Sequence, residues 1–543
     1  MGEGYNDKES DIAINSKLDN NIRFLAEKFD SWCDIVKKRF ELSRMGRAYS
    51  VYIMYIDGLA DNEMVERTIT HPILYEWKDD YRVNIRNALN EDNLTIDKMY
   101  EDTNEQKEEK KFAWDIDVMF HRETEAVDMK SVSTMREAVD AVLGGDTAIF
   151  VDGQKKAIIL STKKYPTRSI ETPEKESGLK GPRDSFNENF RSDTALIRRR
   201  IKDTNLKLEQ GTIGVRTKTV YGLMYMEDLV EQSLLDSIKN KLKSFEIDGI
   251  FDSGMLVHLL EDKWYSPFPQ VQTTERPDKA ASAILEGRVV LLVDNSPEVI
   301  ILPATFNSFF QAADDYYNRF AVGTFARIIR YIAAYLSVLL PALYVAITCF
   351  YPQVLPTDFM LAIIGARNEV TFPVVVEVLL MEFLFELLRE AGIRLPGQMG
   401  NTIGVVGGLI VGQAAVDASL VSTIVVIVVA LTAICSFAIP NEEFASTFRL
   451  LKFVMIILAA VLGLYGILLG ILVIQIHLAS LESFGIPYMM PLTAGTVDDE
   501  IEYQDFVMRK PIFTMTKRPV YTREGRRRRF VKRKNQNAQG GFK

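Results

Sequence analysis

The stretch that decides the fold is Val370–Leu388, which reads VTFPVVVEVLLMEFLFELL. It is apolar enough to enter a lipid bilayer, and nevertheless it carries three acids, Glu377, Glu382 and Glu386. A carboxylate near the centre of a bilayer costs about 2.5–3.5 kcal/mol on insertion scales, and such residues almost always face a bundle interior or a water-filled cavity. Three acids in one segment therefore predict a membrane protein that moves something charged or assembles around it.

The composition fits a chain that is part polar and part apolar. Over 543 residues the mean hydropathy is +0.00 and the net charge is -9. Acids dominate the N-terminal half, whereas residues 509–543 are strongly basic. The three cysteines, Cys33, Cys349 and Cys435, show no CxxC spacing, so they predict neither a disulfide framework nor a zinc site. Residues 1–21 are polar and acidic and lack the apolar core of a secretory signal.

The N-terminal part predicts a first α/β lobe over residues 1–164. Apolar residues follow a helical spacing over residues 11–45, and the mostly charged stretch Asn90–Lys111 predicts an exposed insertion. Apolar runs and turn signals give the other elements, which are a strand at Val51–Ile56, helices at Asp61–Thr70 and Ser131–Leu143, and a hairpin of Ala148–Asp152 with Ala157–Ser161.

A second α/β lobe is predicted over residues 165–315. It opens with a polar connector, Tyr165–Arg183, that is marked by Pro and Gly. The same signals then predict helices at Phe186–Lys202, Asp228–Lys243 and Gly254–Glu261, strands at Thr212–Thr217 and Val220–Met226, and a hairpin of Arg288–Asp294 with Val299–Leu302. No internal repeat is long enough to be recognised in the sequence.

Residues 316–495 predict a membrane domain. Its expected spans are Phe325–Phe350, Val370–Leu388, Leu420–Ile439 and Phe453–Ile476. The Gly-rich stretch Thr402–Val416 is short for a span and predicts a re-entrant segment or the first half of a broken helix. Four full crossings would bring both ends of the chain to the same side.

The charged flanks of these spans predict the orientation. Arg319, Arg327 and Arg330 lie around the start of the first span, and the loop Tyr351–Asp358 at its other end has no Lys or Arg. By the positive-inside rule, the α/β lobes are cytoplasmic. The tail, residues 496–543, is predicted to be cytoplasmic too, because residues 509–534 carry twelve Lys and Arg against one Glu. The fold class is therefore α/β cytoplasmic lobes followed by an α-helical polytopic membrane domain with both termini cytoplasmic.

Helical geometry divides the three acids of Val370–Leu388. At about 100° per residue, Glu382 and Glu386 share a face with Arg389, whereas Glu377 lies nearly opposite Glu386. Two interpretations stay open for Glu382 and Glu386, a satisfied cluster that includes the Glu386–Arg389 pair, or a path for cations. For Glu377, which has no partner on its own helix, the cation path is the favoured interpretation.

A second candidate region combines glycines with one more acid. Gly404, Gly408 and Gly412, like Gly466 and Gly470, are spaced for close approach of helices, and packing is the favoured role. Asp417 follows the first group and is either an acid that lines the ion path or, slightly favoured, the cap of the Leu420–Ile439 helix.

The sequence predicts no enzyme. It has no Walker loop, no GxGxxG after a strand, no GxSxG and no HExxH, and its four histidines are scattered singly, so no catalytic residue, cofactor or metal site is expected. The basic run Arg526–Arg529 is compatible in principle with nucleic acid. Because it follows a membrane domain, attraction to anionic lipid or a topology signal is favoured, and no nucleic-acid partner is expected.

Several motifs resemble the A subunits of bacterial spore germinant receptors, the GerA family. They occur in the family's order and span most of residues 45–495. The motifs are Gly181–Phe186 (GPRDSF), Ala195–Arg200 (ALIRRR), Phe268–Val271 (FPQV), Thr274–Asp278 (TERPD), Glu286–Arg288 (EGR), Val293–Pro297 (VDNSP), Asp315–Tyr317 (DYY), Leu388–Pro396 (LREAGIRLP) and Ile486–Tyr488 (IPY).

The resemblance implies a location, partners and an activity. Receptors of this family lie in the inner membrane of the dormant spore. They pair the A subunit with a transporter-like B subunit, which is thought to sense the nutrient, and with a lipoprotein C subunit. The A subunit is thought to form a homo-oligomer that conducts monovalent cations and so commits the spore to germinate. Bilayer lipid is a further expected partner.

Three alternatives to a receptor channel stay open. One is a spore-membrane paralogue of the same family, which these motifs do not separate from a receptor subunit. Another is a non-conducting scaffold, in which the acids only pair with arginines. The last is a secondary transporter, which would need paired inverted broken helices, and four spans are few for that unless the protein oligomerises.

Overall fold

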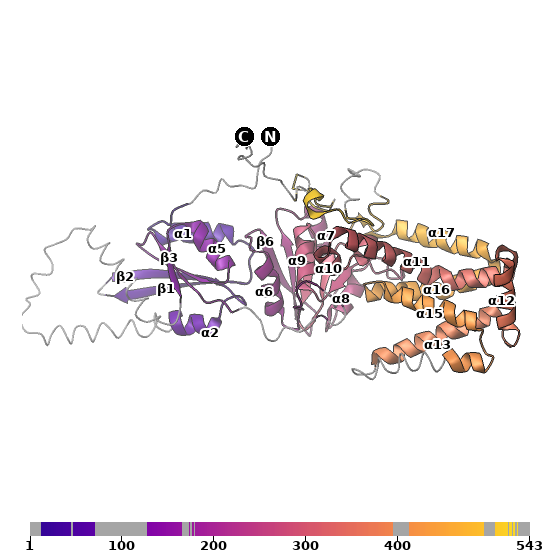
Figure 1. Ribbon diagram of the computed structural model, residues 1–543. Helices are drawn as coiled ribbons and strands as arrows, with labels where there is room; N and C mark the ends of the chain where they lie inside the picture. Colours follow the sequence, from indigo (N-terminus) through magenta and orange to yellow (C-terminus); the bar gives the residue numbers. More distant parts are fainter. Residues whose placement is uncertain are drawn as a thin grey trace, which may run out of the picture.

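Two antiparallel sheets and a long bundle of helices follow one another along the molecule (Figure 1). The computed structural model describes residues 12–44, 47–70, 128–164, 173, 176, 178, 180–394, 412–493, 505–519, 521–523, 525–526 and 529. The predicted insertion at 90–111 and most of the predicted connector at 165–183 lie outside the described residues, as do Gly404 and Gly408.

The first sheet, in lobe 1, has the strand order β1-β2-β4-β5-β3. The sequence of strand β2 is an unbroken apolar run because both faces of the strand are buried. Its residues Tyr52 and Met54 pack on one face of the sheet, and Val51 and Ile53 pack on the other. The elements of lobe 1 are α1 (Leu18–Lys28), β1 (Ile35–Arg44), β2 (Arg47–Ile56), α2 (Asn62–Val65) continued by a π-helical turn (Glu66–Thr70), β3 (Met129–Val132), α5 (Met135–Leu143), β4 (Thr147–Val151) and β5 (Ala157–Leu160).

The strand at 51–56, the helical segment at 61–70 and the 148–161 hairpin are confirmed. The helix predicted over residues 11–45 is wrong beyond Lys28, because Ile35–Arg44 forms strand β1. This segment forms a strand because apolar and charged residues alternate along it. Val36 and Phe40 pack on one face of the sheet, with charged residues between them. The helix predicted from Ser131 begins at Met135, where the Thr134 side chain caps it, and Met129–Val132 is strand β3.

The second sheet, in lobe 2, has the order β6-β7-β9-β10-β8, which is the order of the first sheet shifted by five strands. Helices α6 and α9 pack on one face and α7 and α8 on the other. The elements are α6 (Phe190–Arg200), β6 (Leu206–Ile213), β7 (Thr219–Met226), α7 (Gln232–Lys243), α8 (Ser253–Leu260), β8 (Gln272–Thr274), α9 (Pro277–Leu285), β9 (Val289–Val293) and β10 (Val299–Leu302).

The predicted helices of lobe 2, its 220–226 strand and its last hairpin are confirmed. The strand predicted at Thr212–Thr217 is wrong beyond Ile213, because β6 runs from Leu206 to Ile213, and β8 and α9 were not predicted. Strand β8 has three polar residues and no apolar alternation, and α9 begins at a proline that also resembles a loop signal. The shared strand order is a structural repeat that the sequence did not show.

The lobes are joined by a buried contact. Arg198 on α6 donates from Nη2 to the Asp34 carboxylate of lobe 1 over 2.7 Å, and both side chains are almost fully buried. The guanidinium also lies 3.5 Å from the centre of the Trp32 ring. Trp32 in turn forms a parallel bridge with Leu208 of β6. Residues 32–34 of lobe 1 are therefore anchored on the edge of the second sheet.

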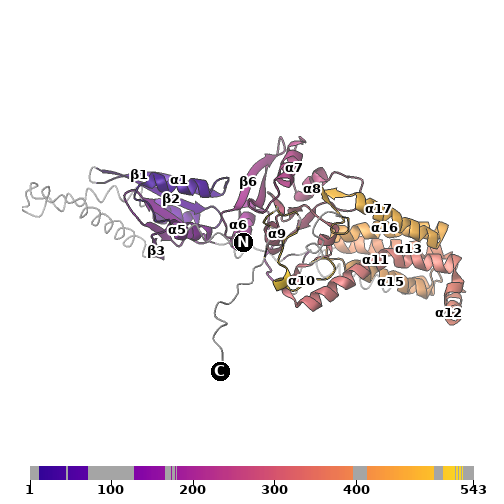
Figure 2. The same cartoon turned by 90° about the horizontal axis from the view of Figure 1, so that it is seen from above.

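The helical bundle extends from lobe 2, and its helices run lengthwise away from it in both views (Figures 1 and 2). Helix α12 lies at the far end of the bundle. The elements are α10 (Ala313–Tyr317), α11 (Phe320–Phe350), α12 (Thr357–Arg367), α13 (Val374–Arg394), a short helix at 412–417, α15 (Thr423–Phe437), α16 (Glu442–Leu462), α17 (Leu464–Ser480), β11 (Glu482–Ser483) and β12 (Ile486–Pro487), with single 3-10 turns at Phe306–Phe309, Pro352–Val354 and Ile512–Thr514.

Among the described residues, α11 and α16 are long and apolar enough to cross a membrane, and α15 and α17 are apolar but shorter. The single span predicted over Phe453–Ile476 is wrong. Helix α16 ends at Leu462, Gly463 takes the left-handed φ of 61°, and α17 starts at Leu464. The two helices pack against each other as a hairpin (Figure 1). Glycine permits this turn because it lacks the Cβ that opposes a positive φ.

Residues 505–529, which we call the C-terminal strap, return to lobe 2. Thr522 forms a bridge with Val230, and the Arg523 N–H donates to the carbonyl of Leu229 over 2.8 Å. The Arg518 side chain donates to the carbonyl of Leu285 over 2.8 Å. The start and the end of the bundle are therefore both fastened to the same lobe.

Candidate functional site

Glu377 lies in the first turn of α13 and is completely buried. Arg367 on α12 donates to its Oε1 from Nη2 over 3.1 Å and from Nε over 3.2 Å. The backbone N–H of Ser422 donates to its Oε2 over 3.1 Å. The sequence analysis placed Glu377 within the segment and found no partner on its own helix. The structure places its partners on α12 and at the start of α15.

Glu382 lies one and a half turns further along α13 and pairs with Lys452 of α16. The Lys452 Nζ lies 2.6 Å from Glu382 Oε2, and the two side chains are 3% and 1% exposed. The other oxygen, Oε1, is buried and accepts no hydrogen bond within the described part of the chain. Lys452 was not predicted as a site residue, although a lysine inside the apolar run of α16 was a visible signal.

Glu386 belongs to a wider network at the end of the bundle near lobe 2. It lies 3.9 Å from Arg389, at the i,i+3 spacing that the sequence predicted, and 3.3 Å from Arg449 of α16. Glu442, at the start of α16, also pairs with Arg389 and with Arg449. The Glu386 side chain is 35% exposed, so it is more accessible than those of Glu377 and Glu382.

These contacts give α13 and α16 a ladder of opposite charges. A buried carboxylate is tolerated when a cation and hydrogen bonds compensate it, and removing one partner leaves an uncompensated charge. Glu377, Glu382 and Glu386 each have such a cation within the same chain. Within one subunit, the ladder therefore fixes α13 against its neighbours.

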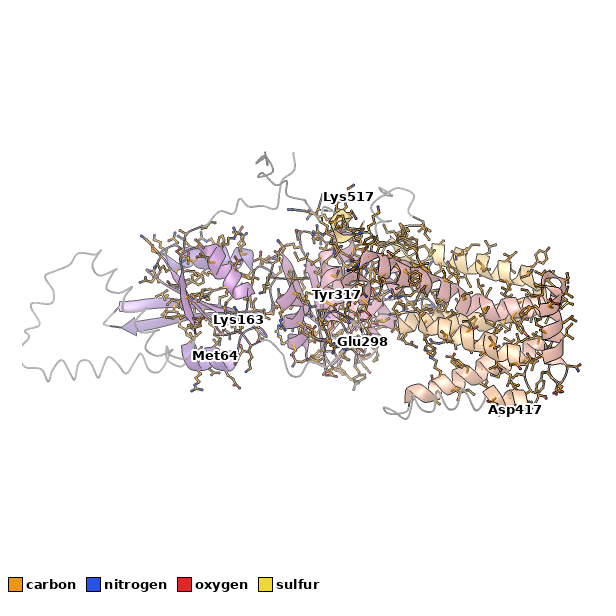
Figure 3. The ribbon with its side chains drawn as sticks, in the orientation of Figure 1. Met64, Lys163, Glu298, Tyr317, Asp417 and Lys517 are labelled. Carbon is orange, nitrogen blue, oxygen red and sulfur yellow. The ribbon has the colours of Figure 1, made fainter. Side chains whose placement is uncertain are left out.

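Asp417 has a different environment from these acids. It is exposed at the end of the 412–417 helix, at the far end of the bundle (Figure 3). Ser422 caps α15 by accepting from the Val425 N–H over 3.4 Å, so Asp417 is not the cap of that helix. In the described part of the chain, its carboxylate has no hydrogen bond or ion pair. Of the four predicted acids, Asp417 alone is both exposed and without such a partner among the described residues.

The described glycines differ in how closely they are packed. A Cβ added at Gly466 of α17 would lie 2.1 Å from the carbonyl oxygen of Leu458 on α16. One added at Gly470 would lie 2.4 Å from the Met455 sulfur. At Gly412 the nearest atom would be a Val426 methyl at 3.7 Å, an ordinary contact. Gly466 and Gly470 therefore permit the close α16–α17 contact within one chain.

A second charged group joins lobe 2, the bundle and the strap. Arg327 of α11 is completely buried between two carboxylates, at 3.4 Å from Asp315 and 2.8 Å from Asp505. In the sequence, Arg327 predicted only the orientation of the first span. The Tyr316 hydroxyl donates to Asp505 over 2.5 Å. Burial and the nearby Asp505 carboxylate raise the pKa of the Tyr316 hydroxyl, so it remains a donor. The junction is therefore a bonded structure and not a loose linker.

No cluster of three or more potential metal ligands occurs among the described residues. In the bundle, Glu377, Glu382 and Glu386 pair with cationic side chains. Their chemistry is that of fixed charges, which can position helices or attract mobile ions.

Comparison with known proteins places the chain in a family. It matches the family described as Bacillus/Clostridium GerA spore germination protein over residues 23–521. It is 34% identical to the uncharacterized membrane protein YfkQ of Bacillus subtilis, over 97% of this chain and 95% of that protein. It is 36% identical to spore germination protein KA of the same organism, over 94% of this chain and 88% of the relative. It is 41% identical to spore germination protein A1, also of Bacillus subtilis, over 69% of this chain and 78% of the relative.

These matches confirm the family that the sequence motifs predicted. They cover both lobes and the helical bundle. The chain therefore belongs to the GerA family of spore germination proteins, the family of germinant-receptor A subunits.

Proposed function

We propose that this chain is the A subunit of a germinant receptor in the inner spore membrane, and that several copies form a channel for monovalent cations. Membership of the GerA family supports the role in germination. The apolar helices α11 and α16 support the membrane location. The partners proposed with it are a transporter-like B subunit, a lipoprotein C subunit and the surrounding lipid.

The exposed carboxylate of Asp417 carries the proposal of a channel made by several copies. Within one subunit Glu377, Glu382 and Glu386 are compensated by cations, whereas Asp417 is exposed on a helix of the bundle. In a ring of subunits, one such acid per copy makes a ring of negative charge, which is how many cation channels attract their ions. Asp417 is therefore the main candidate for a residue that lines the ion path.

Glu382 and Glu386 are proposed as further parts of the path. Each keeps one buried oxygen without a hydrogen bond from the described residues, namely Glu382 Oε1 and Glu386 Oε2. Buried oxygens of this kind are unusual in proteins, and they offer an acceptor to a passing cation or proton. Glu377 has both of its oxygens bonded, so we assign it a structural role instead.

Both chain termini are proposed to be cytoplasmic. The lobes and the C-terminal strap lie at the same end of the bundle, which supports a common side for both ends (Figure 2). The arginines at the start of α11 support the cytoplasmic side by the positive-inside rule.

A non-conducting scaffold is the second candidate. Its support is the set of charge pairs from α13 to α12 and α16, which neutralises three of the four predicted acids inside one chain. In that case the lobes would dock partners, and the acids would only hold helices together.

Flux measurements on the full-length protein in liposomes separate the two candidates. The channel proposal expects potassium flux from the wild type, and a several-fold lower cation-over-chloride permeability from Asp417→Asn. Asp358→Asn is the matched control, because Asp358 is also an exposed acid, at the start of α12. Absence of flux from an assembled oligomer would favour the scaffold. Equal selectivity in the wild type and in Asp417→Asn would remove Asp417 from the path.

A further inference from the structure

A polar cavity of about 60 Å³ lies where the lobe, the bundle and the strap meet. A buried water needs about 10–15 Å³ of such space, so the cavity has room for about four. It is lined from lobe 2, from residues 305–311 that lead into the bundle, from residues 490–491 that follow it, and from the strap. Lys517 of the strap is one of the lining residues and is labelled in Figure 3. The cavity thus touches every segment that connects the lobe to the helices.

Positive side chains outnumber negative ones in the lining of this cavity. Three cationic side chains line it, Arg288, Lys517 and Arg529, against two acids, Glu286 and Asp505. Asp505 is already engaged by Arg327, at 2.8 Å, and by the Tyr316 hydroxyl, at 2.5 Å. The Asp505 carboxylate is therefore already neutralised by Arg327, and it does little to balance the cations of the cavity.

Glu286 is a weak counter-charge as well. Its carboxylate lies 3.8 Å from Arg288 and 3.6 Å from Arg529, and the Tyr521 hydroxyl is 3.4 Å away. These contacts are longer than the 2.7–2.9 Å of a strong charge-assisted hydrogen bond. Burial raises the pKa of the Glu286 carboxyl, which favours its neutral form. The described lining therefore carries an excess of positive charge.

Arg288 independently indicates that a hydrogen-bond acceptor binds in the cavity. Its side chain is only 8% exposed, its Nη2 donates to the Tyr521 hydroxyl over 2.8 Å, and the guanidinium stacks on the Tyr521 ring. Its Nε is buried and has no hydrogen-bond partner among the described residues. Nearly all buried donors in proteins are satisfied, so an open guanidinium donor beside a polar cavity indicates an acceptor other than the described residues.

We propose that this cavity binds a small oxyanion of phosphate size, held by Arg288, Lys517 and Arg529. Guanidinium groups match the geometry of phosphate oxygens and can donate two parallel hydrogen bonds to them. The ligand is either a free phosphate or the phosphate monoester of a lipid headgroup. In either form the anion bridges lobe 2, the segments that enter and leave the bundle, and the strap. Its release loosens the strap.

Phosphate binding to the purified full-length protein in detergent tests this proposal. Equilibrium dialysis at constant ionic strength should show saturable binding of inorganic phosphate, near one per chain, or of a short-chain phosphatidate if lipid is the source. The double variant Lys517→Gln/Arg529→Gln should weaken it at least tenfold. Both side chains are partly or largely exposed, so these changes leave the fold intact. Arg523→Gln is the control, because Arg523 is an exposed basic residue of the same strap that does not line the cavity.

The outcomes are distinct. Saturable binding that the double variant loses and Arg523→Gln keeps supports the site, and the anion that binds identifies the source. Equal losses in the double variant and the control overturn it, because they indicate attraction to the basic tail as a whole. Absence of saturable binding by either anion at millimolar concentration also overturns it. None of these results depends on channel activity.

Discussion

Lys452 on α16 and Glu382 on α13 form an ion pair of 2.6 Å between two side chains that are almost completely buried. The residues are seventy positions apart in sequence, and their helices contact along the bundle. This pair is a buried link between α13 and the α16 helix that packs beside it.

Replacing Glu382 by glutamine should destabilise the bundle strongly. The Lys452 ammonium would remain buried with only the more distant Glu386 carboxylate, at 3.9 Å, and breaking a buried pair costs about 3–5 kcal/mol. Thermal unfolding in detergent should show a lower midpoint. The double variant Glu382→Met/Lys452→Met is the control, and it should recover most of the loss because no unpaired charge stays behind. A single variant as stable as the wild type would mean that water reaches the pair.

Glu377→Gln should act on structure more than on ion flux. The variant weakens the Arg367 contact that ties α12 to α13 and reduces the acceptor for the Ser422 N–H at the start of α15. A loss of about 1–3 kcal/mol is expected for a hydrogen-bonded buried charge. Arg367→Gln should give a similar loss, and the double variant should lose less than the sum of the two, because they remove one interaction. Additive losses would show that the two residues act independently.

Gly466→Ala should disrupt the α16–α17 hairpin. The new Cβ would lie 2.1 Å from the Leu458 carbonyl oxygen, so the helices must separate. Gly412→Ala is the matched control, because its nearest atom would be 3.7 Å away. Size-exclusion profiles and unfolding midpoints in detergent should change for Gly466→Ala and stay near wild type for Gly412→Ala. Equal behaviour of the two variants would contradict the hairpin packing.

Arg198→Ala should free lobe 1 from lobe 2. The change leaves Asp34 buried without its cation and removes the stacking on Trp32, a loss of about 3–5 kcal/mol at the interface. Hydrogen exchange should rise in residues 32–34 and along β6. Arg199→Ala, at the exposed neighbouring position, should leave exchange unchanged. Unchanged exchange in Arg198→Ala would place the main interlobe contact elsewhere.

Local patterns predicted the elements that are buried on both faces or amphipathic. The run VYIMYI of β2 and the run RVVLLVD of β9 have both faces buried in hydrophobic clusters. Each strand is therefore apolar along its length, and this pattern predicted it. Strand β1 was missed because its residues alternate with charges, and their spacing also fits a helix over a few turns. The α16–α17 turn was missed because Gly463 interrupts the apolar run without a polar residue.

The candidate site was predictable only in part. The three acids of α13 were visible as charges in an apolar segment. Their partners were not, because Lys452 and Ser422 come from distant segments and only the fold brings them close. The exposure of Asp417 likewise depends on where the 412–417 helix lies. Sequence spacing describes one helix, whereas the role of a buried charge is set by the helix beside it.

Lobe 2 is built from two separate parts of the chain, one before the helices and one, the strap, after them. Synthesis proceeds from the N-terminus, so the strap leaves the ribosome last, when every helix of the bundle has already been made. The Arg288–Tyr521 contact and the Val230 edge can therefore close only in a chain that has been translated through the whole bundle. A chain that stalls earlier leaves this edge of the lobe uncovered, so an incomplete chain is expected to be cleaved by proteases more readily than the finished one.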